Sequence, residues 1–185
     1  MKPCKKFIKQ SAKEFRVDQG DIYSNISFFK CIDISSGNLN LNKLDFSNVV
    51  VLFVSQTCDL CRESEKENSI LSVLVVPLFP LEEFKLGKHL EGLGVETDSV
   101  STKVIERYRK KEHVRYRIID LDEEEKIKYH LEDSFVIDFR YFFTADISQF
   151  SRKKYKISLN NLFREDISQS FSNYLSRIGL PEIKK

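Results

Sequence analysis

A group of small, polar and reactive side chains follows an apolar run in the first third of the chain. The run begins at Val49, and Ser55, Gln56, Cys58 and Asp59 stand at its end. It is too short for a membrane span and rich in β-branched residues, so it predicts a strand buried on both faces. A cysteine at the end of such a strand, with a carboxylate beside it, is a candidate nucleophile. These four residues are therefore candidate catalytic residues.

Cys58 also has an inert interpretation. A catalytic thiol needs a base or a positive neighbour, and none of the three histidines lies near Cys58 in the sequence. The alternative is a small thiol that caps the core, with Asp59 accepting backbone N–H groups in the turn. Cys58 and Cys61 form a C-x-x-C pair, but the chain has no second paired motif for a closed zinc site. A redox pair is the other interpretation, although such sites open a helix in a βαβ unit and this pair lies between an apolar run and a charged link. We therefore predict no metal and no cofactor.

A second candidate site is a run of interleaved basic and aromatic residues. Its basic members are Arg107, Arg109, Lys110, Lys111, Arg115 and Arg117. Tyr108, His113 and Tyr116 stand between them. Basic side chains with aromatic residues between them are typical of surfaces that contact RNA or single strands, and the basic residues at 152–156 could extend this one. The acidic runs at 120–125 and 63–67 could instead neutralise the segment, leaving a solvated, salt-bridged face.

Composition limits the classes of function. The 185 residues are enough for one domain with a sizeable core. Thirty basic and 28 acidic residues leave a net charge of +2, which is too small for bulk attraction to nucleic acid. The basic N-terminus is not followed by the apolar segment of a signal peptide, and the four cysteines show no secreted disulfide pattern. We therefore expect a cytoplasmic protein that does not associate with a membrane.

The pattern of apolar residues predicts a sheet, two helices, and a short helix or irregular segment over 81–95. Expected strands cover residues 22–34, the run that begins at Val49, 69–78, a hairpin of 114–118 with 127–131, then 134–143 and 154–159. Residues 38–48 are expected to form a polar loop, and Pro77 to lie at a sheet edge or strand end. One helix is expected from 102 to about 112. A C-terminal helix from 159 to 178 would be capped by Ser158 and stopped by Gly179 and Pro181.

These elements predict one α+β domain over residues 1–185. Residues 1–19 would be a lead-in arm and 20–80 the core of a strongly bent, mainly antiparallel sheet. Residues 81–133 would be an inserted helix and hairpin. Residues 134–185 would supply closing strands and a helix packed on the sheet.

The order of Gly20-Asp21, a strand ending at Ser55 and a second strand ending near Pro77 resembles the MazF/PemK toxins. That resemblance implies a small SH3-like β-barrel, homodimers and ribosome-independent endoribonuclease activity. Ser47-Asn48 stands where that family has Arg-Pro, and Leu78-Phe79 follows Pro77 where its catalytic Thr region would be. The resemblance therefore supports the barrel more than the activity.

A second resemblance rests on two separated motifs. The strand end VSQTCDL at 54–60 and the ending RIGLP at 177–181 are similar to a group of uncharacterised bacterial proteins. Those proteins share S-Q-x-C-D-[LI] and R-[IV]-G-L-P in the same order. This resemblance implies a family without an established activity.

Three functions follow as expectations. The first is a small bacterial module related to toxin-type barrels, acting in defence or stress and contacting RNA or DNA through the basic segment. The second is an enzyme that uses Cys58 on an unknown substrate. The third is a binding subunit without chemistry of its own, whose protein partner would be encoded nearby. The sequence does not decide whether the protein is an enzyme.

Overall fold

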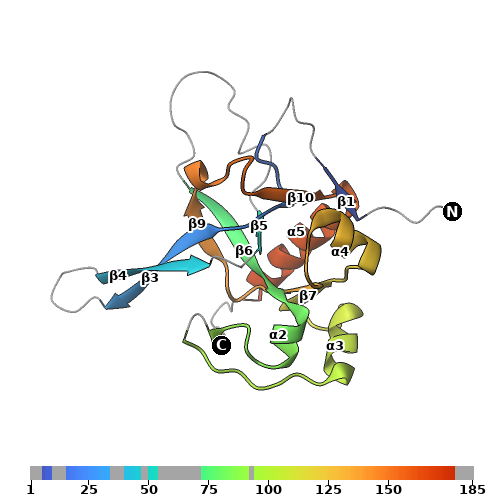
Figure 1. Cartoon of the computed structure of the whole chain (residues 1–185). Coiled ribbons are helices and arrows are strands. Elements are labelled where there is room, and N and C mark those ends of the chain that lie inside the picture. The colour runs from blue at the N-terminus through green and yellow to red at the C-terminus, as the bar shows by residue number, and fades with distance from the viewer. Residues whose placement is uncertain are drawn as a thin grey trace, which may run out of the picture.

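The fold is known from a computed structural model, which describes residues 6–9, 16–33, 40–46, 50–53, 72–91 and 94–177. The strands are β1 (Phe7–Ile8), β2 (Asp21–Tyr23), β3 (Ile26–Asp33), β4 (Asn40–Phe46), β5 (Val50–Phe53), β6 (Ser72–Pro80), β7 (Tyr116–Ile119), β8 (Phe135–Asp138), β9 (Phe143–Asp146) and β10 (Tyr155–Leu159). The helices are α2 (Leu81–Lys85), α3 (Thr102–Arg109), α4 (Glu123–Tyr129), α5 (Asn161–Leu175) and the short 3-10 helix η3 (Ile147–Gln149). Figure 1 shows their arrangement.

The described strands form two antiparallel sheets, which confirms the α+β class. The larger sheet has the order β1-β10-β2-β5-β6-β8-β7, and β9 also pairs with β6. Strands β1 and β7 are the two ends of this order, so the described strands do not close into a barrel. Residue Phe7 is 3% exposed in β1, so the expected lead-in arm contributes an edge strand to the sheet.

Strand β6 occupies the middle of the larger sheet, and the prediction that Pro77 marks an edge or strand end is wrong. Pro77 pairs with Val51 of β5. On its other side, β6 pairs with β9 up to Val75 and with β8 from Phe79. Pro77 therefore lies at a break between two ladders, where a residue without an N–H group removes no ladder hydrogen bond.

The predicted strand over 22–34 is two strands, because the chain turns between them. Asn25 has a φ of 58°, a left-handed conformation that ends β2 and redirects the chain into β3. Strand β3 then pairs with β4, so the expectation of a polar loop over 38–48 is wrong for residues 40–46. The β3–β4 hairpin projects away from the larger sheet (Figure 1).

Helix α5 covers the larger sheet as predicted from its three-and-four spacing. Its Ile167 and Phe171 are buried in one cluster with Ile22 and Leu78 of the sheet. The N-cap is Asn160, whose side chain accepts a hydrogen bond from the Phe163 N–H at 3.1 Å. The prediction of Ser158 as the cap is wrong. Gly179 and Pro181 lie outside the described residues.

The predicted second strand of the hairpin, residues 127–131, is wrong. Residues 123–129 form α4, and Asp122 caps it by accepting a hydrogen bond from the Glu125 N–H at 2.7 Å. The Glu125 side chain accepts in return from the Asp122 N–H, which completes a capping box. Strand β7 pairs instead with β8, and the predicted strand over 134–143 is divided into β8 and β9.

Helices α2 and α3 lie together at one end of the molecule, beside β7 and β8 (Figure 1). Phe84 of α2, Ile105 of α3 and Val136 of β8 are all buried in one cluster. This packing fixes the position of α3, and with it the basic segment, against the end strands of the sheet.

Candidate nucleic-acid interface

The first candidate site lies outside the described residues. Strand β5 is described to Phe53, and Ser55, Gln56, Cys58 and Asp59 follow it in the segment 54–71. Cys61 belongs to the same segment. The assignment of Cys58 as a nucleophile therefore stays a prediction, as does its inert alternative.

The basic segment is spread over α3, the turn that follows it, and β7. Helix α3 buries Ile105 completely and turns its charged residues outward. It ends at Arg109, and Lys111 has a φ of 60°, a left-handed conformation that reverses the chain toward β7. This turn brings the aromatic residues of α3 and β7 to the same surface.

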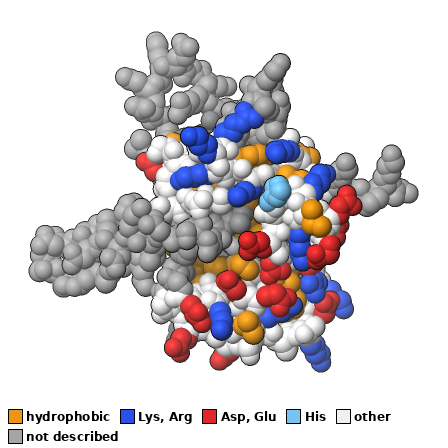
Figure 2. All heavy atoms as spheres, in the orientation of Figure 1, with side chains coloured by type: hydrophobic (Ala, Val, Ile, Leu, Met, Phe, Trp, Pro, Cys, Tyr) orange, Lys and Arg blue, Asp and Glu red, His pale blue; other side chains and the backbone are white. Residues whose placement is uncertain are grey.

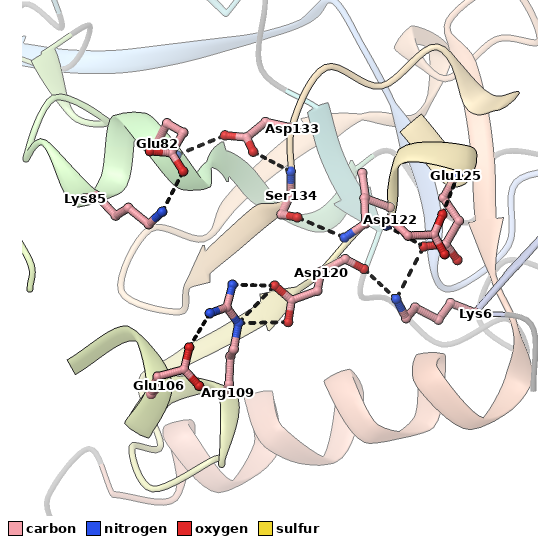
Figure 3. Close-up of polar contacts among 11 residues, drawn as sticks. Lys6, Glu82, Lys85, Glu106, Arg109, Asp120, Asp122, Glu125, Asp133 and Ser134 are labelled. Atoms are coloured by element: carbon pink, nitrogen blue, oxygen red, sulfur yellow. Dashed lines mark hydrogen bonds and ion pairs between the residues drawn. The ribbon is translucent and has the colours of Figure 1, made fainter. Parts of the chain in front are cut away.

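Acidic side chains neutralise most of the cations of α3 and its turn. Arg107 pairs with Glu112 at 3.1 Å, and Lys111 pairs with Asp166 of α5 at 2.5 Å. Arg109 lies between Glu106 and Asp120, with nitrogen–oxygen distances of 2.5 and 2.7 Å (Figure 3). Figure 2 accordingly shows acidic and basic side chains close together over the lower part of the molecule. Exposed pairs of this kind contribute little stability but reduce the positive potential.

Lys110 differs from its neighbours in this respect. Its side chain is exposed, and among the described residues no acidic group pairs with it. The basic residues at 152–156 do not extend the segment. They precede and begin β10, at the opposite end of the molecule from α3 (Figure 1).

Arg117 is held inside the fold rather than presented at the surface. It is 8% exposed, and its Nε donates to Ser170 Oγ of α5 at 2.7 Å. Its Nη1 donates to the backbone oxygens of His113 and Tyr116 at 3.0 and 2.8 Å. Burial lowers the pKa of this guanidinium from its ordinary value. Arg117 therefore joins β7 to α5 and fixes the turn that carries His113.

Arg115 is anchored by a buried carboxylate. Its Nε donates to Asp138 Oδ1 at 2.6 Å, and its Nη2 donates to Asp138 Oδ2. Asp138 is the last residue of β8, and its side chain is fully buried. Arg140 approaches the same Oδ2 atom at 3.5 Å, so one carboxylate lies beside two guanidinium groups.

Aromatic rings surround this charged group. Tyr108 and Tyr116 are stacked, with ring centroids 4.4 Å apart and planes at 25°. The exposed His113 lies 5.5 Å from the Tyr108 ring and 5.1 Å from the Tyr116 ring. We call Tyr108, His113 and Tyr116 the aromatic face. The Arg115 guanidinium lies over the Tyr116 ring at 4.5 Å.

Two histidines near this face are kept neutral. The Nδ1 atom of His113 accepts a hydrogen bond from the Arg115 N–H at 3.2 Å, so its proton lies on Nε2. Burial, and then the charge of Arg115, lower the pKa of His113. The same two causes lower the pKa of His89 to about 4. Nδ1 of His89 is buried, and no described group forms a hydrogen bond with it.

Sequence reasoning placed Tyr108, Arg115 and Tyr116 in the candidate surface, but it missed Asp138 and Arg140. One signal was present, because Asp138 interrupts an otherwise apolar run from Phe135 to Phe139. A carboxylate buried in such a run needs a hydrogen-bonding partner. Only the β7–β8 register, which pairs Tyr116 with Asp138, identifies that partner as Arg115.

No protein-family model matches the chain, and comparisons with curated proteins and with solved structures give no match. Within the described ranges, no three His, Cys, Asp or Glu side chains are grouped so that they could hold a metal ion. None of the helices in that part of the chain has both the length and the apolar character needed to cross a bilayer.

Proposed function

We propose that this protein is a nucleic-acid-contacting module that binds single strands at the aromatic face. The observation that carries the proposal is the stacked pair of Tyr108 and Tyr116, with exposed His113 against both rings and Arg115 over one of them. Proteins that bind single strands combine aromatic rings on which bases stack with nearby cations. Each stacked base contributes about 1–3 kcal/mol.

The charge around the face favours a single strand over a duplex as the ligand. Residues 101–120 contain seven basic and three acidic side chains, but several of the cations are already paired with carboxylates. A duplex is bound mainly through its phosphates, whereas exposed bases add stacking that does not depend on charge. If the protein neutralises about two phosphates, a plot of the logarithm of the binding constant against the logarithm of the salt concentration should have a slope of about −1.4.

The proposal also includes a relationship to the toxin-type SH3-like barrels of bacteria, with a cytoplasmic role in defence or stress. It is supported by the layout on which the resemblance rests. Gly20 leads directly into β2, and β2, β5 and β6 are successive antiparallel neighbours. A homodimer is part of the same proposal, and the oligomeric state in solution tests it separately.

Binding of single-stranded RNA and DNA oligonucleotides, measured by fluorescence anisotropy at several salt concentrations, tests the main proposal. The variant is His113→Asn, because an asparagine oxygen can still accept the Arg115 N–H while the ring is lost. The matched control is His130→Asn, at an exposed histidine whose φ of 53° asparagine tolerates. We expect His113→Asn to weaken binding about tenfold, or about 1.4 kcal/mol. Equal affinity of the two variants, or no binding by the wild type, would contradict the proposal.

A further inference from the structure

We infer that Arg115 and Arg140 form a phosphate clamp, which holds one phosphodiester of a single strand beside the aromatic face. This inference rests on the proposed function and deepens it. It names the backbone phosphate as the group recognised, and it assigns a binding role to Arg140, which lies outside the basic segment.

The two arginines lie at the same end of the antiparallel β7–β8 pair, on different strands, and converge on one carboxylate. Arg115 precedes β7, and Arg140 follows β8, whose last residue is Asp138. Backbone hydrogen bonds fix both positions. The Phe139 N–H donates to the Arg115 oxygen at 3.0 Å, and the Arg140 N–H donates to Asp138 Oδ1 at 3.1 Å. The backbone positions of both arginines are therefore fixed before any ligand arrives, which reduces the entropy lost on binding.

The pair keeps a positive charge that Arg109 of α3 has lost. Two guanidinium groups lie beside one carboxylate, whereas Arg109 lies between two. Arg115 uses Nε and Nη2 on Asp138, and Arg140 uses only Nη2. Within the described residues, Nη1 of Arg115 and both Nε and Nη1 of Arg140 have no acceptor. These groups are suited to phosphate oxygens, which guanidinium groups bind through parallel hydrogen bonds.

Each arginine of the clamp lies beside an aromatic ring. Arg115 lies over Tyr116, and Arg140 lies 5.2 Å from the centroid of the Tyr141 ring. The Arg115 side chain is 20% exposed and that of Arg140 is 43% exposed, so a ligand can reach both. A phosphate between the arginines would place its flanking bases toward the aromatic face on one side and Tyr141 on the other.

The test compares Arg140→Gln with Arg152→Gln, which removes the same charge from an exposed arginine in the segment that precedes β10. Arg140 is exposed and makes only long side-chain contacts, so its replacement should leave the fold intact. The probes are a single-stranded oligouridylate and the same oligomer with an uncharged methylphosphonate backbone.

We expect Arg140→Gln to weaken binding of the charged oligomer about tenfold, because one charge-assisted hydrogen bond to a phosphate is lost. Its affinity for the uncharged oligomer should equal that of the wild type, and Arg152→Gln should match the wild type with both probes. If the wild type binds and Arg140→Gln binds the charged oligomer as tightly as Arg152→Gln does, the clamp is contradicted and the proposed function stands. If the wild type binds neither oligomer, both proposals fail.

Discussion

Arg109 of α3 and Asp120, the residue after β7, form a forked ion pair. Arg109 Nε lies 3.0 Å from both carboxylate oxygens of Asp120, and Nη2 lies 2.7 Å from Oδ1 (Figure 3). Lys6 donates to the Asp120 backbone oxygen at 2.6 Å and also reaches Glu125 of α4 at 3.3 Å. Asp120 therefore links α3 to Lys6, the residue before β1, and it neutralises one positive charge of α3.

Asp120→Asn should strengthen binding of single strands, because it leaves Arg109 paired with one carboxylate, that of Glu106, instead of two. One additional phosphate contact would steepen the salt slope by about 0.7. The free energy of unfolding should fall by no more than about 1 kcal/mol, because the pair is partly exposed. Anisotropy titrations at several salt concentrations measure the slope. Glu124→Gln, at an exposed carboxylate of α4, is the control for charge alone. An unchanged slope in Asp120→Asn would show that Arg109 does not reach the ligand.

Arg115→Gln should destabilise the fold in a manner that depends on pH. Burial raises the pKa of the Asp138 carboxyl, and the hydrogen bonds from Arg115 oppose that rise. Without Arg115 the folded-state pKa should rise further above the unfolded value. A carboxyl group of this kind binds more protons in the folded state, so stability falls as pH rises through the interval between the two pKa values.

The loss of unfolding free energy in Arg115→Gln should therefore be larger at about pH 8 than at about pH 5. Leaving Asp138 buried without its Arg115 partner corresponds to about 3–5 kcal/mol at the higher pH. Urea unfolding of the variant and the wild type at both pH values measures this difference, with Arg152→Gln as the control. The same loss of unfolding free energy at both pH values would mean that Arg115 does not change the pKa of Asp138.

Gly20→Ala should destabilise the protein more than Gly94→Ala. Both glycines have positive φ, at 83° and 68°, so each alanine incurs the left-handed cost of about 1–2 kcal/mol. A Cβ at Gly20 would also lie 2.9 Å from Arg164 Cγ, whereas nothing lies within 4 Å at Gly94. Thermal unfolding of both variants measures the additional destabilisation in Gly20→Ala. Equal shifts would show that the Arg164 side chain moves away freely.

Asp122→Ala should cost about 1 kcal/mol of stability, because it removes the side chain that caps α4. The control is Glu124→Ala. Glu124 lies in the same helix but outside the capping box, so its replacement should change stability far less. Urea unfolding of the two variants measures the loss of stability in each. A similar effect in both would mean that the cap contributes nothing beyond charge at the helix start.

The regular elements were predictable where a local pattern controls them. The three-and-four spacing from Leu162 to Leu175 identified α5, but its cap depended on a distant contact. Ser158 lies in β10, where its hydroxyl donates to the buried Asp21 at 2.5 Å, and so Asn160 takes the capping position. Alternation over 127–131 was misleading because Ile127 is 75% exposed, and the capping box at Asp122 determines the structure instead.

The candidate site was predictable only in part, for a related reason. The basic and aromatic residues are adjacent in sequence, so their common surface was visible from the pattern. Their ion pairs are not local, since Lys111 meets Asp166 of α5 and Arg115 meets Asp138 of β8. Which cations remain available therefore depends on how α5 and β8 pack, and no spacing rule supplies that information.

The most direct test of the central claim is NMR mapping of the surface during titration with a single-stranded oligouridylate. We expect two sets of signals to shift together and saturate together: the ring signals of Tyr108, His113 and Tyr116, and the side-chain Nε–H signals of Arg115 and Arg140. If those signals stay in place while signals from residues 152–156 move, the ligand binds elsewhere and the proposal is wrong.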